Sequence, residues 1–93
     1  MKTGAQLISE ERQRQIDDEG YTPSSDDTYS QPELVDAAIC YASRCSDIDV
    51  DTVRDWPWNE EYWKPTDDKV KTLTKAGALI AAEIDRLQRQ ATK

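Results

Sequence analysis

Residues 66–89, TDDKVKTLTKAGALIAAEIDRLQR, carry the clearest periodicity in the chain and decide its fold. The run opens with a threonine and two aspartates, which cap a helix and complement its dipole, and it ends near basic residues. Its apolar positions recur at intervals of 3, 4, 3, 4 and 3 residues, and they are Val70, Leu73, Gly77, Ile80, Ile84 and Leu87. This spacing predicts one long helix with a coiled-coil-like seam, in which Gly77 lets another backbone approach closely. We expect the chain to form homo-oligomers through this seam.

A first helix is predicted over residues 4–19. Thr3 and Gln6 have the spacing of a capping box, and Gly20 is a typical residue to end a helix. Negative charge at the end of a helix opposes its dipole, and this helix ends in three acids, Asp17, Asp18 and Glu19. We therefore expect Arg or Lys partners there, with a hydrated magnesium ion or ligand donor groups as the alternative.

A second helix is predicted over residues 31–45, because Ser30 and Glu33 form another capping box and a broad apolar face follows. Residues 46–65 show no helical period and hold all three tryptophans, so we expect an ordered Trp-rich loop. The prediction is a single all-α domain over residues 1–93, a compact three-helix fold with this loop between helices two and three.

The core of this domain must be small. Leu, Ile and Val together number 15 of 93 residues, there is no Phe, and the net charge is -7. Such a composition lies near the limit at which chains stop folding. Alanines that pack closely and large aromatic rings supply part of the missing buried area, and a partner supplies the rest.

Composition also excludes several classes of function. The chain has no histidine, which removes the usual general base and every His-containing zinc site, and we expect no catalytic residue, metal or cofactor. Cys40 and Cys45 point to different sides of one helix and cannot bridge, which predicts a reducing cytoplasm. We expect no membrane span, and the acidic charge argues against generic nucleic-acid binding.

The segment WPWNEEYWKP, residues 56–65, is the most informative stretch for function. Rings this close together either cover a core that lacks aliphatic side chains or line a pocket in which planar ligands stack. The three rings belong to Trp56, Trp58 and Trp63. Bases elsewhere could hold an anion, and the candidates are Arg12, Arg14, Lys64, Lys69, Lys71 and Lys75.

A partial acidic pattern resembles the all-α nucleotide pyrophosphohydrolases, which hold magnesium on paired acidic helices through an ExxE and a later ExxD motif. Glu33 and Asp36 match the second motif. The first is broken, because Gln13 and Arg14 stand three places after Glu10 and Glu11.

Four segments together resemble a widespread group of small phage and prophage accessory proteins. They are ERQRQIDDEGYT with a following Asp pair, ELVDAAICYA, WPW with WKP, and KAGALIAAEIDRLQR. The resemblance covers nearly the whole chain and implies a role inside an infected cell. The chain departs from the group's pattern at Tyr21, where Trp is frequent, and at Ser25, where His is frequent.

Shorter segments are similar to the ryanodine-receptor repeat, which has a GW…DD turn, a PxLV helix start and a late LxTL…G helix. Here the turn is Gly20-Tyr21 with Asp26-Asp27, and the later segments begin at Pro32 and Val70. Because such repeats bind adenine nucleotides, the similarity implies a nucleotide pocket that includes Tyr21 and Asp27.

The leading hypothesis is therefore a phage-encoded, non-enzymatic protein that sequesters a nucleotide-like ligand in counter-defence or host takeover. A base would stack on Trp58 or Trp63, with Trp56 beside them, while Arg12, Lys64 and Lys75 would meet phosphate. The first alternative is an acidic inhibitor that mimics nucleic acid toward a basic host defence protein. The second is a magnesium nucleotide pyrophosphohydrolase.

Overall fold

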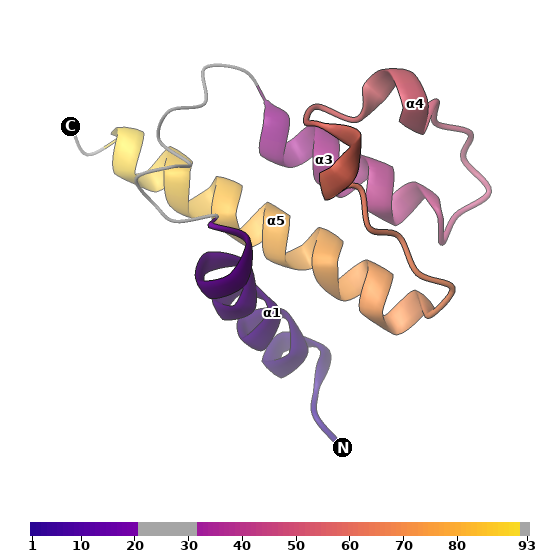
Figure 1. Ribbon diagram of the computed structural model, residues 1–93. Helices are drawn as coiled ribbons and strands as arrows, with labels where there is room; N and C mark the ends of the chain where they lie inside the picture. Colours follow the sequence, from indigo (N-terminus) through magenta and orange to yellow (C-terminus); the bar gives the residue numbers. More distant parts are fainter. Residues whose placement is uncertain (21–31, 92–93) are drawn as a thin grey trace.

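The computed structural model describes residues 1–20 and 32–91, and over these residues the chain is all-α with no strand (Figure 1). None of the described helices combines the length and the apolar composition that a bilayer-spanning segment requires. The elements are α1 (Gly4–Glu19), α3 (Glu33–Ser43), α4 (Thr52–Asp55), the 3-10 helix η1 (Glu60–Tyr62) and α5 (Lys69–Ala91). The predicted all-α class is confirmed, and the loop 46–65 contains two short helical elements.

Helix α1 has the predicted bounds and caps. The Thr3 side chain accepts a hydrogen bond from the Gln6 N–H, and the Gln6 side chain accepts one from the Thr3 N–H. Gly20 ends the helix with a φ of 74°, a left-handed conformation that glycine adopts without strain, and its N–H bonds to the Gln15 carbonyl.

Helix α3 is shorter than predicted at both ends. Pro32 is its N-cap and makes no side-chain capping bond, so the helix starts two residues after the predicted position, while Ser30 lies outside the described residues. At the other end, the N–H groups of Arg44, Cys45 and Ser46 bond to carbonyls three residues back. These tighter turns end the α-helix at Ser43. Both cysteines are free, as predicted.

Helix α5 starts at Lys69, three residues later than predicted, because Asp68 is the residue that caps it. The Asp68 carboxylate accepts the N–H of Lys71 at 3.2 Å, and the Thr66 hydroxyl accepts the N–H of Asp68 at 3.2 Å. Thr66 therefore positions the capping residue outside the helix. The helix ends at Ala91, two residues beyond the predicted end.

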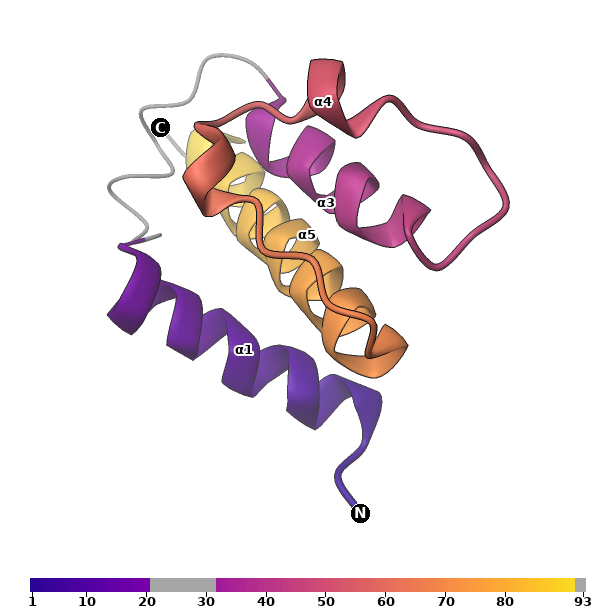
Figure 2. The same cartoon turned by 45° about the vertical axis from the view of Figure 1, so that its right-hand side comes forward.

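Helix α5 is the central element of the fold. Helices α1 and α3 pack on different sides of it, and their backbones do not come into contact with each other (Figures 1 and 2). The core lies mainly between α3 and α5, and its members are Leu34, Ala37, Ala38, Tyr41, Ala76, Leu79 and Ala82. The three tryptophans and Ala42 are partly buried against this cluster.

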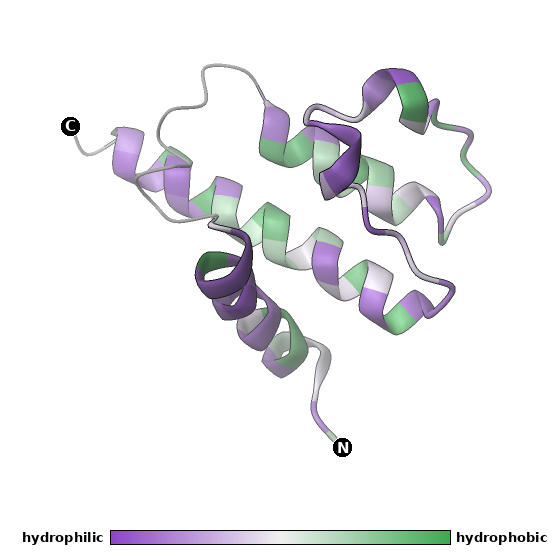
Figure 3. Ribbon diagram, viewed as in Figure 1, coloured by the Kyte–Doolittle hydropathy of each residue, from purple (hydrophilic) through white to green (hydrophobic). Residues whose placement is uncertain are grey.

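The large side chains of the predicted seam lie mostly at the surface of α5. Val70, Leu73, Ile80, Ile84 and Leu87 are each about half exposed. Figure 3 shows hydrophobic residues recurring along this helix. The buried side of α5 is instead formed by one large aliphatic residue, Leu79, and by small or polar residues, Thr72, Ala76, Ala78, Ala82 and Glu83. Alanines allow helices to approach closely, so the neighbouring helices pack on the small side chains.

Gly77 is a seam position that α1 of the same chain covers. A Cβ atom at this position would stand 2.6 Å from Cδ1 and 2.8 Å from Cγ1 of Ile8 on α1. The predicted close approach at Gly77 is therefore made by α1.

We expect Gly77→Leu to destabilise the chain by about 1–3 kcal/mol, because the new side chain would displace Ile8. Urea denaturation measures the change. The double variant with Ile8→Ala should lose less stability than the sum of the two single variants. Gly4→Ala is the control, because nothing lies within 4 Å of its added Cβ. Additive losses would show that α1 does not pack on Gly77.

Candidate functional site

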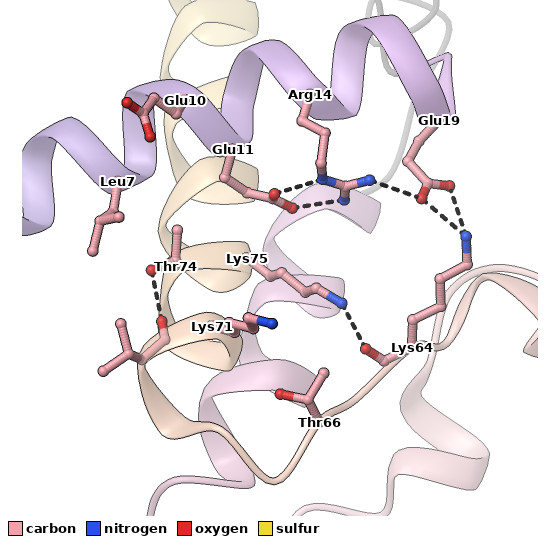
Figure 4. A pocket seen from close by; sticks show the side chains of 11 residues that line it. Leu7, Glu10, Glu11, Arg14, Glu19, Lys64, Thr66, Lys71, Thr74 and Lys75 are labelled. Atoms are coloured by element: carbon pink, nitrogen blue, oxygen red, sulfur yellow. Dashed lines mark hydrogen bonds and ion pairs between the residues drawn. The ribbon is translucent and has the colours of Figure 1, made fainter.

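A groove of about 680 Å³ lies between α1 and the N-terminal half of α5 (Figure 4). The segment that connects η1 to α5 forms one end of it, through Lys64 and Thr66. The side chains that line the groove carry charges of both signs, and they are Leu7, Glu10, Glu11, Arg14, Glu19, Lys64, Thr66, Val70, Lys71, Thr74 and Lys75. The volume is typical of small-molecule sites.

A chain of ion pairs crosses one side of this groove (Figure 4). Arg14 binds both carboxylate oxygens of Glu11, with Nε–Oε1 at 2.6 Å and Nη2–Oε2 at 2.8 Å. Its Nη1 atom lies 3.4 Å from Oε1 of Glu19. Lys64 Nζ reaches the same carboxylate, at 2.9 Å and 3.2 Å from its two oxygens. The pairs connect α1 to the segment before α5. The acidic end of α1 thus has the Arg and Lys partners that were expected for it, and they are Arg14 and Lys64.

Lys64 is held in place by its backbone as well. Its N–H donates to the hydroxyl of Tyr41 on α3 at 3.1 Å, and its carbonyl accepts a hydrogen bond from Lys75 Nζ at 2.7 Å. The Tyr41 hydroxyl in turn lies 3.4 Å from the carbonyl of Tyr62. Helices α3 and α5 therefore fix the segment between η1 and α5, which forms one end of the groove.

The ion pairs set the charge states of the two acids. Burial raises the pKa of Glu11, but the hydrogen bonds and charge of Arg14 outweigh it and leave the pKa below its ordinary value. For Glu19, the hydrogen bond from Lys64 is the main cause of a lowered pKa. The hydrogen bond to Glu11 raises the pKa of Arg14. Both carboxylates are ionised at neutral pH.

Lys75 has a different environment from the other bases of the groove. Burial lowers the pKa of its ammonium group, which lies 5.7 Å from the centre of the Tyr41 ring. Its nitrogen donates to the Lys64 carbonyl, and no carboxylate of the described residues forms an ion pair with it. An ammonium group has three donors and the Lys64 carbonyl takes one, so Lys75 can bind an anion without breaking an existing ion pair.

The structure brings together two of the predicted ligand-binding residues, Lys64 and Lys75, in the groove. Arg12 lies on α1 but does not line it, and Tyr21 and Asp27 lie outside the described residues. The binding roles of these residues stay predictions.

The tryptophans form an aromatic cluster on α3, away from the lining of the groove. The ring of Trp63 lies 4.8 Å from those of Tyr41 and Trp56, and Trp56 meets Tyr41 and Trp58 edge-on at 5.5 Å. Trp56 also donates its indole N–H to the Asn59 carbonyl at 3.1 Å. The structure packs these rings against the core, as one of the two alternatives expects, and a ligand-binding role for them stays a prediction.

Sequence reasoning expected a basic partner for Glu19 and placed Glu11 in the broken magnesium pattern, but it did not pair Glu11 with Arg14 or Glu19 with Lys64. The spacing of Glu11 and Arg14, three residues apart on one helix, was the available signal. The contact between Glu19 and Lys64 joins residues 45 apart and leaves no local pattern.

The acids of the partial magnesium pattern lie on separate helices. Glu10 and Glu11 are on α1, Glu33 and Asp36 are on α3, and the backbones of these two helices are not in contact. Within residues 1–20 and 32–91, no group of three or more Cys, Asp or Glu side chains is placed to hold a metal ion. The two halves of the pattern are therefore not brought together.

Comparisons with known proteins give no relative: no family model, no curated protein and no solved structure matches the chain.

Glu19→Gln should lower stability at neutral pH, by about 1 kcal/mol. The pKa of Glu19 is lowered in the folded chain, so its ion pairs stabilise the fold above the ordinary value of 4.5. This contribution is lost as the pH falls through the lowered pKa. Thermal unfolding from pH 7 to pH 3 should therefore show a difference from the parent protein that shrinks with acid. Glu61→Gln is the exposed control, and a difference independent of pH would contradict the ion pairs.

Tyr41→Phe should destabilise the chain by about 1–2 kcal/mol, because it removes the acceptor of the Lys64 N–H while it keeps the ring. Chemical denaturation measures the loss, with Tyr62→Phe as the control on an exposed ring. Equal stabilities of the Tyr41 and Tyr62 variants would show that the Lys64 N–H does not depend on this hydroxyl.

Proposed function

We propose that this chain binds a small anionic, nucleotide-like ligand in the groove between α1 and α5 and does not turn it over. The observation that carries the proposal is Lys75, a partly buried ammonium group in the groove without a carboxylate partner among the described residues. Placing a cation in such a position has a free-energy cost, and a bound anion offsets it.

The remaining lining fits the other parts of such a ligand. Lys71 adds a second ammonium group on α5, one helical turn from Lys75, and Thr66 and Thr74 add hydroxyl groups. Leu7 and Val70 offer an apolar surface on which a base or sugar ring could rest. A phosphate group would therefore meet Lys71 and Lys75, while the rest of the ligand extends toward Leu7.

The geometry changes the binding mode expected from the sequence. Stacking on Trp58 or Trp63 requires those rings in the same cavity as the lysines, and neither ring lines the groove. In this proposal the tryptophans do not contact the ligand and act by positioning a residue that lines the groove. They hold the segment that carries Lys64 against α3, through the contact of Trp63 with Tyr41.

The resemblance to small phage accessory proteins suggests the setting of this binding. A protein that binds a nucleotide-like signal without converting it lowers the free concentration of that signal. We propose that the chain acts in this way in the cytoplasm of an infected cell, in counter-defence or host takeover.

One surface feature favours a second candidate, the acidic inhibitor of a host protein. Ile48 and Val53 are 73% and 95% exposed, and exposed aspartates stand beside them at Asp47, Asp49 and Asp51. Exposed apolar side chains among acids suit a basic, partly apolar protein surface. This candidate predicts binding that weakens with salt and does not respond to nucleotides.

Titration calorimetry and thermal unfolding against nucleotides, cyclic nucleotides and ADP-ribose compounds test the main proposal. A ligand at 100 times its Kd should stabilise the chain by about 2.7 kcal/mol. Lys75→Met should weaken binding at least about tenfold, the equivalent of about 1.4 kcal/mol.

The matched control is Lys69→Met, which removes an exposed lysine of the same helix outside the groove and should leave binding unchanged. Equal losses in the two lysine variants would contradict the groove as the site. A panel without any ligand response would favour the acidic inhibitor.

A further inference from the structure

Helix α5 turns nearly all of its large aliphatic side chains away from the core. It contains six, and Leu79 alone is fully buried. The other five are between 47% and 59% exposed, and they are Val70, Leu73, Ile80, Ile84 and Leu87. Leaving these side chains in water forgoes the stabilisation that their burial would give.

The arrangement of the other elements explains why this stripe is uncovered. Helices α1 and α3 flank α5 without meeting, and the segment after η1 crosses one open side of α5 (Figure 2). Lys75 marks that covered side through its bond to the Lys64 carbonyl. By helical periodicity the middle of the stripe lies opposite Lys75, while Val70 at its N-terminal end also lines the groove.

The stripe has no charged residue. The positions that form it and border it are Val70, Leu73, Thr74, Ile80, Ala81, Ile84, Leu87 and Gln88, of which Val70 and Thr74 also line the groove. All charges of α5 lie at other positions, Lys69, Lys71, Lys75, Glu83, Asp85, Arg86 and Arg89. A chain with a net charge of -7 thus presents one neutral, apolar strip along its longest helix.

We propose that this strip is the interface with a second copy of the same chain, packed antiparallel along α5. The 3–4 spacing of the strip is the spacing at which two helices interlock their side chains, and a two-fold axis lets one strip bind another. A neutral strip can pack against an identical neutral strip. A charged partner surface would find no side chain of opposite charge on it with which to form ion pairs.

The charges beside the strip favour one direction. The first seven residues of α5 contain Lys69, Lys71 and Lys75, of which Asp67 and Asp68 directly before the helix offset two charges, while the later part balances Glu83 and Asp85 against two arginines. Parallel copies would bring the lysine-rich ends together, and antiparallel copies keep them apart. In the antiparallel register, Leu73 packs beside Ile84 of the second copy, and Val70 packs beside Leu87.

Sedimentation equilibrium over a concentration series tests the interface. The parent protein should reach twice the 10.6 kDa mass of one chain. Ile84→Glu should halve the mass at the same concentration, because it places a charge in the strip at a site far from the groove. Val53→Glu, at the most exposed aliphatic side chain outside α5, should stay dimeric. A parent protein that remains at 10.6 kDa, or an Ile84 variant that remains dimeric, overturns the proposal.

Cysteine cross-linking tests the direction in a Cys45→Ser background. The double variant Leu73→Cys and Ile84→Cys should form a covalent dimer on mild oxidation, and either single variant should not. The two positions are about 16 Å apart along one helix, so they cannot link within a chain. Cross-linking of the single Leu73→Cys variant would show parallel packing and overturn the antiparallel assignment.

Discussion

The small side chains on the buried side of α5 are the constraint on which the rest of the structure depends. Ala76, Ala78 and Ala82 are at most 3% exposed. Because an alanine side chain ends at Cβ, helices can pack closely against this surface, but such contacts bury little area for each residue. The aromatic segment 56–63 must then supply the missing volume over the core, and the larger aliphatic side chains of α5 remain outside.

Tyr41 connects that core to the groove. Its ring belongs to the aromatic cluster, its hydroxyl holds the Lys64 backbone, and the ammonium group of Lys75 lies over its face. A substitution that shifts the core packing would therefore also shift the groove, because Tyr41 contacts both. The ion pairs of Glu19 with Arg14 and Lys64 form a second connection, which joins α1 to the same segment.

Local signals in the sequence predicted most of the fold and a smaller part of the site. Caps at Thr3 and Gly20 gave α1 its bounds, because both depend on neighbours in the sequence. The buried side of α5 was harder to predict from the sequence. The helix has two stripes, one of large aliphatic and one of small side chains, and periodicity favours the stripe with the larger side chains, which lies at the surface. Lys64 and Lys75 were predicted from charge, but the separation of the tryptophans from them depends on where residues 56–63 fold back on α3.

The grouping of all three tryptophans in one cluster determines what optical measurements on this chain can detect. Their emission reports the environment of the segment around η1 and of α3. Helix α1 contains no tryptophan or tyrosine, and it contacts α5 on a different side. Detachment of α1 would thus leave the emission spectrum almost unchanged while it reduced the helical circular dichroism. Disagreement between these two signals would reveal a partly unfolded state in which α3 and α5 remain paired.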